Sequence, residues 1–252
     1  MFRVTLMVLA GLAMLTVMLM PHNSAEAAPD MQTITLNTGF NQNAQVKYPL
    51  PSSAPVLDLF WTVTSDPVSG TVPRSANVIN KHAAWQPALA DSQWISYVTN
   101  GSTGIKKGPY VYEKCFCLTK ALFSNQDAIQ KSSFDVSVRA DDAFSLALNG
   151  QNLLSTGSGG LGAFNGPPAT VTLQGAQLVQ KLKPGRNCLT VRVDDIGTVI
   201  TGFNLAGSLT TTGIDGIASG PKVTSQFTNC STCRNARLDV GHALDRIPSL
   251  SN

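Results

Sequence analysis

Val136-Ser-Val-Arg-Ala-Asp-Asp-Ala-Phe-Ser-Leu-Ala-Leu-Asn149-Gly150 is the stretch that decides the fold class of this chain. Two runs in it alternate apolar and polar residues, on either side of an acidic break at Asp141 and Asp142. A period of two predicts half-buried strands, because successive side chains of a strand point to opposite faces. The second run stops at Asn149-Gly150, a dipeptide that tolerates the positive φ angles of a tight turn.

Further runs of the same kind lie on both sides of this stretch. Leu182 to Asp194 reads as a turn followed by an alternating strand. The sequence Val191-Arg-Val-Asp-Asp195 echoes Val138-Arg-Ala-Asp-Asp142. Val56 to Val63 predicts another strand, with Leu57, Leu59 and Trp61 on one apolar face. Short strands separated by turn signals indicate an all-β sandwich, with only short helical turns expected near 121–130 and 176–182.

The two ends of the chain differ from this pattern. Residues 1–27 have the layout of a secretory signal peptide: a basic start, an apolar run and small residues at the expected cleavage point. An uncleaved anchor is the alternative, although the run is short for a span of about 20 residues. We therefore predict a signal peptide over 1–27, a β-sandwich over 28–209, and a linker with a cysteine-containing tail over 210–252. The expected location is secreted, periplasmic or cell-surface, with no membrane span after signal cleavage.

Composition excludes several function classes. Hydrophobic residues make up 43% of the chain, too many for a disordered protein, and charged residues make up only 13%. The net charge is +3, and Lys106-Lys107 is the only basic doublet, so nucleic acid is not expected as a partner.

Catalytic patterns are weak. The sequence has three histidines, of which His22 belongs to the predicted signal peptide, and no nucleophile motif lies beside His82 or His242. The adjacent carboxylates at 141–142 and 194–195 point to opposite faces if they lie on strands, so neither pair forms an acid–base site alone. We predict that the protein is not an enzyme.

Five cysteines suggest disulfides in an exported protein. Cys115 and Cys117 lie two apart on a predicted strand, so a bridge from Cys188 to Cys117 or to Cys115 would join neighbouring strands. Cys230 and Cys233 predict a small-loop disulfide in the tail. An odd number leaves one cysteine that could link two copies, or link the protein to a surface partner.

The order of motifs resembles the galactose-binding-domain-like jelly roll of exported bacterial proteins and of accessory modules of glycoside hydrolases. The resemblance covers about Val56 to Leu209. It rests on the acidic pair before the strand ending in Asn149-Gly150, on the Pro-Gly-x-Asn turn at 184–187, and on Gly202-Phe203-Asn204. It implies a lectin-like or adhesive module, often with a structural calcium ion.

Residue chemistry supplies candidates for such a role. Sugar binding needs an aromatic face and polar partners, and we predict Trp85, Asp91, Asp142 and Asn149 as ligand-binding residues. Trp85 lies in a loop and is the best candidate for an exposed platform; a packed loop anchor is the alternative. Asp141 and Asp142 are the predicted calcium ligands, because hard cations prefer oxygen; turn aspartates that accept backbone N–H groups are the alternative.

The predicted function is a non-catalytic carbohydrate-binding or adhesin-like module that binds a glycan or a surface protein. The alternative is a structural subunit of an extracellular or envelope assembly.

Overall fold

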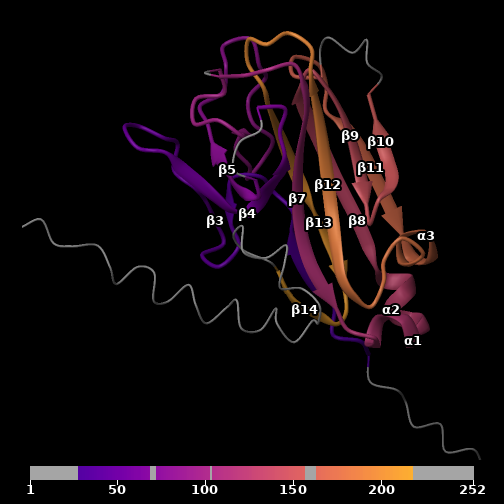
Figure 1. Cartoon of the computed structure of the whole chain (residues 1–252). Coiled ribbons are helices and arrows are strands. Elements are labelled where there is room, and N and C mark those ends of the chain that lie inside the picture. The colour runs from indigo at the N-terminus through magenta and orange to yellow at the C-terminus, as the bar shows by residue number, and fades with distance from the viewer. Residues whose placement is uncertain (1–27, 69–71, 103, 157–162, 218–252) are drawn as a thin grey trace, which may run out of the picture.

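The structure is a computed structural model that describes residues 28–68, 72–102, 104–156 and 163–217 (Figure 1). The predicted signal peptide and residues 218–252 lie outside the described residues.

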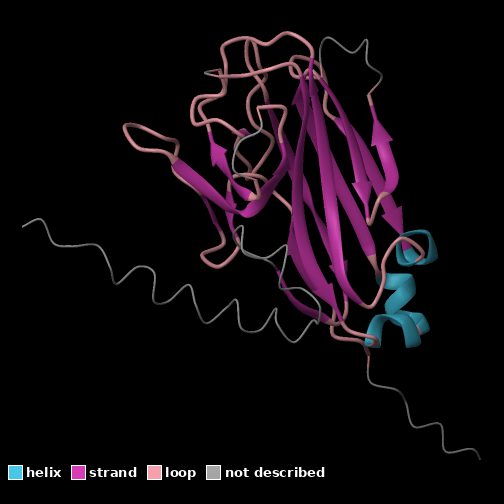
Figure 2. Cartoon of the chain, in the orientation of Figure 1, coloured by secondary structure: helices cyan, strands magenta, loops and turns pink. Residues whose placement is uncertain are grey.

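The described chain is nearly all β, as the period-two pattern predicts. Its three helices are short and follow the expected segments: α1 (Ala121–Ser124), α2 (Gln126–Lys131) and α3 (Gly175–Val179). They gather at one end of the long strands, and most of the longer loops gather at the other end (Figure 2). The strands are β1 (Gln32–Thr35), β2 (Phe40–Asn41), β3 (Val46–Lys47), β4 (Val56–Ser65), β5 (Arg74–Val78), β6 (Ile95–Ser96), β7 (Gly108–Leu118), β8 (Ser133–Asp141), β9 (Ala143–Leu148), β10 (Gln151–Ser155), β11 (Ala169–Gln174), β12 (Gly185–Asp195), β13 (Gly202–Thr211) and β14 (Ile214–Ile217).

One sheet wraps around the core. Its strand order is β10-β9-β12-β7-β4-β5-β6-β13-β8-β11, with β1 paired to β13 and β14 paired to β7. The two end strands, β10 and β11, also contact each other, so the sheet is nearly closed into a sandwich or flattened barrel. The inward face carries a single large apolar core that includes Trp61, Tyr112 and Phe203.

The stretch that predicted the fold contributes to both walls of this structure. β8 pairs with β11 and β13, whereas β9 pairs with β10 and β12. The acidic break at Asp141 and Asp142 is therefore the corner where the chain crosses between walls. The predicted turn is confirmed: Asn149 and Gly150 have φ angles of 52° and 78° and join β9 to β10.

β4 departs from the predicted alternation. Trp61 is buried as expected, but Leu57 and Leu59 are 45% and 37% exposed, and Asp58 is fully buried between them. The pairing of β4 with β5 shifts between Asp58 and Thr62. A bulge of this kind changes which side chains face inward, so the apolar face predicted for the whole strand was wrong for its first half.

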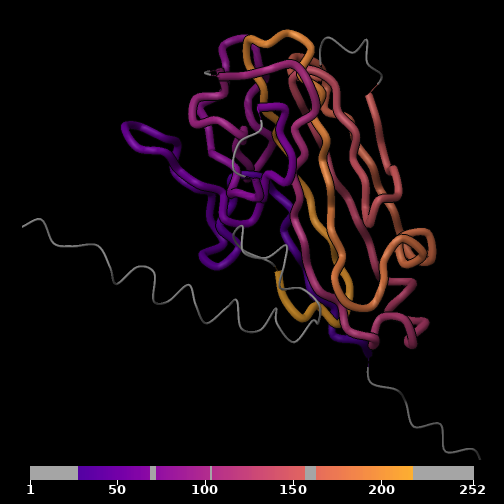
Figure 3. Tube along the Cα trace, in the orientation of Figure 1, coloured from indigo at the N-terminus to yellow at the C-terminus, as the bar shows by residue number. Residues whose placement is uncertain are grey.

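The sheet extends beyond the boundary expected at residue 209. Thr210 and Thr211 complete β13, and β14 adds a further strand against β7. At the other end of the chain, β1 pairs antiparallel with β13, so the first strand lies beside a strand from near the end of the described chain (Figure 3).

Candidate functional site

Three aspartates lie together at the corner between β8 and β9. The indole Nε1 of Trp85 donates a 2.7 Å hydrogen bond to Asp141 Oδ2. The main-chain N–H of Ile196 donates to Asp142 Oδ2 at 2.8 Å. Asp195 Oδ1 accepts two main-chain N–H groups from the turn that follows β12. Its second oxygen, Oδ2, is buried and has no hydrogen-bond partner among the residues that the structure describes.

Burial gives this corner unusual electrostatics. Removal from water is the main cause that raises the pKa of Asp141, to about 8, and the hydrogen bond with Asp142 adds to it. Burial also raises the pKa of Asp195, with a further contribution from the charge of Asp142. The corner is thus a place where negative charge is costly and where a proton or a cation would relieve it. The sequence argument that Asp141 and Asp142 face apart was wrong, because the chain turns a corner between them.

The structure contradicts an exposed role for Trp85. Its side chain is only 3% exposed, packs against Trp94 with ring centroids 4.2 Å apart, and contacts Ile79 in a second small core. Trp85 is therefore the packed loop anchor that was the alternative, since its polar edge is used by Asp141 and its faces are covered.

Asn149 is also committed to the fold. Its side-chain amide donates to the main-chain oxygen of Lys181 and to Asn187, both at 2.8 Å, while its oxygen accepts from the N–H of Cys188. These contacts tie the β9–β10 turn to the turn before β12. Asn149 and Asp142 flank opposite ends of β9, roughly 20 Å apart at strand spacing, so the predicted ligand residues do not form one site.

Asp91 lies in a different place, a groove of about 890 Å³ on the outer face of β8 and β13. The β2–β3 hairpin forms one side of the groove. Asp91 is an exposed residue with a positive φ of 54°. Its main-chain oxygen accepts a 2.8 Å hydrogen bond from Asn37, which fixes the loop at the rim.

Polar side chains point outward along the groove floor. Asp135 lies directly across from Ser208, and Ser137 lies across from Ala206. Among the described residues, the side chains of Asp91, Asp135, Ser137 and Ser208 have no hydrogen-bond partner, so all four can bond a ligand. The outward positions of the alternating β8 run could have indicated Asp135 and Ser137 in the sequence. Nothing local indicated that the hairpin would wall them in.

A glycine shapes the middle of this floor. Gly207 has a φ of 152°, and a Cβ added to it would lie 2.0 Å from the main-chain oxygen of Asp135. Its N–H donates to Asn37 and its oxygen accepts from the N–H of Leu36, at 2.8 Å each. The backbone is held tightly here, so the groove has a rigid base.

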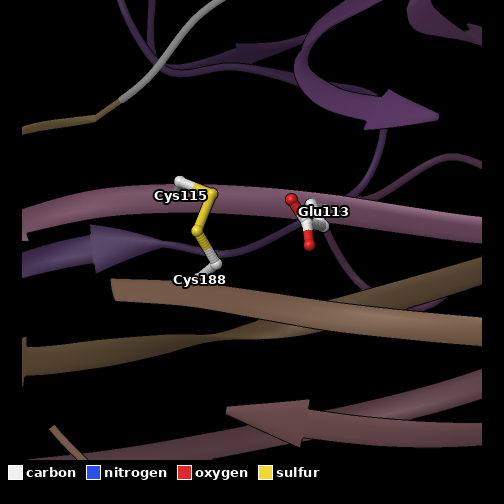
Figure 4. A group of neighbouring side chains, drawn as sticks. All are labelled: Glu113, Cys115 and Cys188. Atoms are coloured by element: carbon white, nitrogen blue, oxygen red, sulfur yellow. A yellow bond between two sulfur atoms is a disulfide. The ribbon is translucent and has the colours of Figure 1, made fainter. Parts of the chain in front are cut away.

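A disulfide joins Cys115 to Cys188, 73 residues apart in sequence (Figure 4). The two residues are direct partners in the β7–β12 ladder, whereas Cys117 is opposite Arg186. Of the two predicted pairings, the one with Cys115 is confirmed and the one between Cys188 and Cys117 was wrong. Cys117 is fully buried and is itself disulfide-bonded. Cys230 and Cys233 lie outside the described residues.

The same region contains a group of potential metal ligands. Glu113, Cys115 and Cys188 place their ligand atoms within 4.8 Å of one another, and within the described ranges they are the three-residue group that does so. The sulfur atoms of Cys115 and Cys188 are bonded to each other in the disulfide shown in Figure 4. A metal ion binds a cysteine as its thiolate, so the oxidised pair does not form a metal centre with Glu113.

Comparisons with known proteins give little. No family model and no curated protein matches this chain. Among solved structures, it is similar to a β-glucuronidase from glycoside hydrolase family 2, with 18% sequence identity and a TM-score of 0.25. That likeness covers 71% of this chain and 17% of the enzyme. It is too weak to indicate a function. In the part of the chain that the structure describes, no helix is long and apolar enough to cross a membrane.

Proposed function

We propose that this protein is an exported, non-catalytic module that binds carbohydrate in the groove over β8 and β13. The groove itself is the observation that carries the proposal. Its lining comes from four separate segments of the chain, and hydrogen bonds of the Gly207 main chain to Asn37 and Leu36 hold its floor.

The chemistry of the groove suits a sugar. Carboxylates accept hydrogen bonds from hydroxyl groups, and serine hydroxyls both donate and accept. Asp91, Asp135, Ser137 and Ser208 supply this mixture, and the exposed Val46 on the hairpin adds an apolar contact for a sugar ring. A rigid, preformed floor lowers the entropic cost of binding.

The jelly-roll architecture of galactose-binding-like domains is the fold that we propose in detail, because the walls of the sheet, the acidic corner and the Asn149-Gly150 turn fit that resemblance. The Cys115–Cys188 disulfide supports an extracellular or otherwise oxidising location.

We also propose a structural calcium ion at the aspartate corner, as the resemblance implies. The orphaned Oδ2 of Asp195 supports it, because a buried carboxylate oxygen without a donor is stabilised by a cation. Asp141 and Asp142 would contribute oxygens beside it. The three aspartates do not meet as closely as the Glu113 group, so water or main-chain oxygens would complete the ligand set.

A glycan array with residues 28–252 tests the binding function. Asp135→Ala and Ser208→Ala should each weaken retention of whatever sugar is captured, whereas the exposed Asp127→Ala, on α2, should not. Retention that is equal in all variants would show that the groove is not the site, and no retention of any glycan would contradict the carbohydrate proposal.

The alternative, a structural subunit of an envelope assembly, predicts different behaviour. An assembly subunit should increase in mass with concentration in sedimentation or light scattering, whereas an isolated binding module should stay monomeric without ligand.

A further inference from the structure

A shallow apolar groove lies on the outer face of β4 and β5, away from the proposed sugar site. Its volume is about 630 Å³, and the outward-facing Leu57 and Leu59 form its apolar side. Two exposed leucines at adjacent outward positions of one strand cost free energy in water unless something covers them.

The register of β7 shows which part of the chain can reach this groove. On the same edge of β7, Thr62 of β4 lies opposite Glu113, and Ile217 of β14 lies opposite Phe116. Three residues of strand separate these two positions, roughly 10 Å. The chain that follows Ile217 therefore starts on the β7 edge that pairs with β4, in the direction of the half of β4 that precedes Thr62 and contains Leu59.

Cys117 supplies a second, independent observation. It is fully buried and disulfide-bonded, and it lies opposite Gly216 in the same β7–β14 pairing. Cys115 and Cys188 are already bonded to each other.

We propose that residues 218–233 fold back over Leu57 and Leu59 and are fastened to β7 by a disulfide from Cys117 to Cys230 or Cys233. Twelve residues separate Ile217 from Cys230. At about 3.3 Å per residue they reach roughly 20 Å outward and the same distance back, enough to cover the groove and return to Cys117. Within them, Val223 and Phe227 are four apart and share one face of an extended segment, which gives the leucines an apolar partner.

This arrangement excludes the small-loop bridge between Cys230 and Cys233 that the sequence predicts. It leaves one of these two cysteines as the thiol that can link the protein to a partner. The sandwich and residues 218–233 are then one covalent unit.

Two measurements on the intact mature protein test the proposal. Peptide mapping without reduction should yield one linked pair that contains Cys117 and either Cys230 or Cys233, with the other cysteine alkylated. A photo-crosslinking phenylalanine analogue introduced at Leu59 should capture a peptide from residues 218–233 of the same chain, and the same group at the exposed Val199 should not.

The proposal is overturned if Cys117 is found alkylated or linked to another chain, or if the mapping recovers a Cys230–Cys233 bridge. It is also overturned if the group at Leu59 captures a second copy, or captures nothing from the tail. A truncation after Ile217 provides the matched reference, because it should increase binding of a hydrophobic dye, and Leu59→Ser in that truncated chain should reverse the increase.

Discussion

The hydrogen bond from Trp85 Nε1 to Asp141 Oδ2, 2.7 Å long, joins a loop to the corner where the chain passes between the two walls of the sheet. It connects the small Trp85–Trp94 core to the aspartate corner, so packing and charge at this end of the molecule depend on each other.

The raised pKa of Asp141, about 8, makes stability depend on pH. An unfolded aspartate ionises near 3.8, so between that value and about 8 the folded state holds a proton that the unfolded state has lost. Stability should therefore fall as pH rises through this window. Urea midpoints measured from pH 4.5 to 8 should decline for the wild type and decline much less for Asp141→Asn. Asp30→Asn, at an exposed position, should keep the wild-type slope; an unchanged slope in Asp141→Asn would contradict the account.

Lys114 shows the opposite dependence. Its side chain is fully buried near the rings of Phe60 and Trp61, and within the described part of the chain its Nζ has no hydrogen-bond partner. Burial lowers its pKa from 10.5 to about 7, although the neighbouring charge of Asp58 opposes the shift. Above pH 7 the unfolded state binds a proton that the folded state lacks, so this residue contributes a stability that rises with pH.

Replacement of Lys114 by Met should remove that contribution. The stability of the variant relative to wild type should fall between pH 7 and pH 9, by as much as about 1 kcal/mol per pH unit. Denaturant titrations of both proteins at three pH values measure this difference in the free energy of unfolding. The exposed Lys131→Met should show a constant difference, and a constant difference for Lys114→Met as well would mean that the buried lysine does not titrate in this range.

The Cys115–Cys188 disulfide should contribute substantially to stability, because it closes a loop of 73 residues in the unfolded chain. Replacing both cysteines with Ala should lower the free energy of unfolding by about 2–4 kcal/mol in oxidising buffer. Under strong reduction the wild type should lose a similar amount, whereas the double variant should lose less. If reduction lowered the free energy of unfolding equally in both proteins, the loss would come from other cysteines and not from the Cys115–Cys188 disulfide.

Calcium at the aspartate corner predicts a change in melting temperature. Millimolar calcium should raise the Tm of residues 28–252 and a chelator should reverse the rise, because a ligand that binds only the folded state stabilises it. Asp195→Asn should abolish the response, and Asp127→Asn should retain it. A wild type that does not respond to calcium would remove the ion from the account.

The sequence predicted the elements of the fold better than their arrangement. The alternation on both sides of Asp141 and Asp142 identified β8 and β9, and Asn149-Gly150 marked the turn, because these signals depend on neighbouring residues. The bulge in β4 and the placement of β14 on β7 depend on pairing between distant segments, so local alternation could not reveal that Leu57 points outward or that residues 214–217 join the sheet.

The site was harder to predict for the same reason. Asp91 was selected as a polar residue near a strand end, and it lines the groove. Trp85 and Asn149 instead make hydrogen bonds to distant parts of the chain, which local sequence could not indicate. The similar sequences at 138–142 and 191–195 are too short to indicate a duplication. They nevertheless contain the three aspartates that meet at the aspartate corner.

A thermal-unfolding titration with a groove-blocking variant tests whether the groove over β8 and β13 binds a glycan. A glycan retained on the array should raise the Tm of the wild type and of Ser133→Trp, because position 133 lies on the same face of β8 but outside the groove. Ser137→Trp, which fills the groove, should fold and show no rise. A rise of equal size in Ser137→Trp, or no rise in the wild type with any glycan, would contradict the claim.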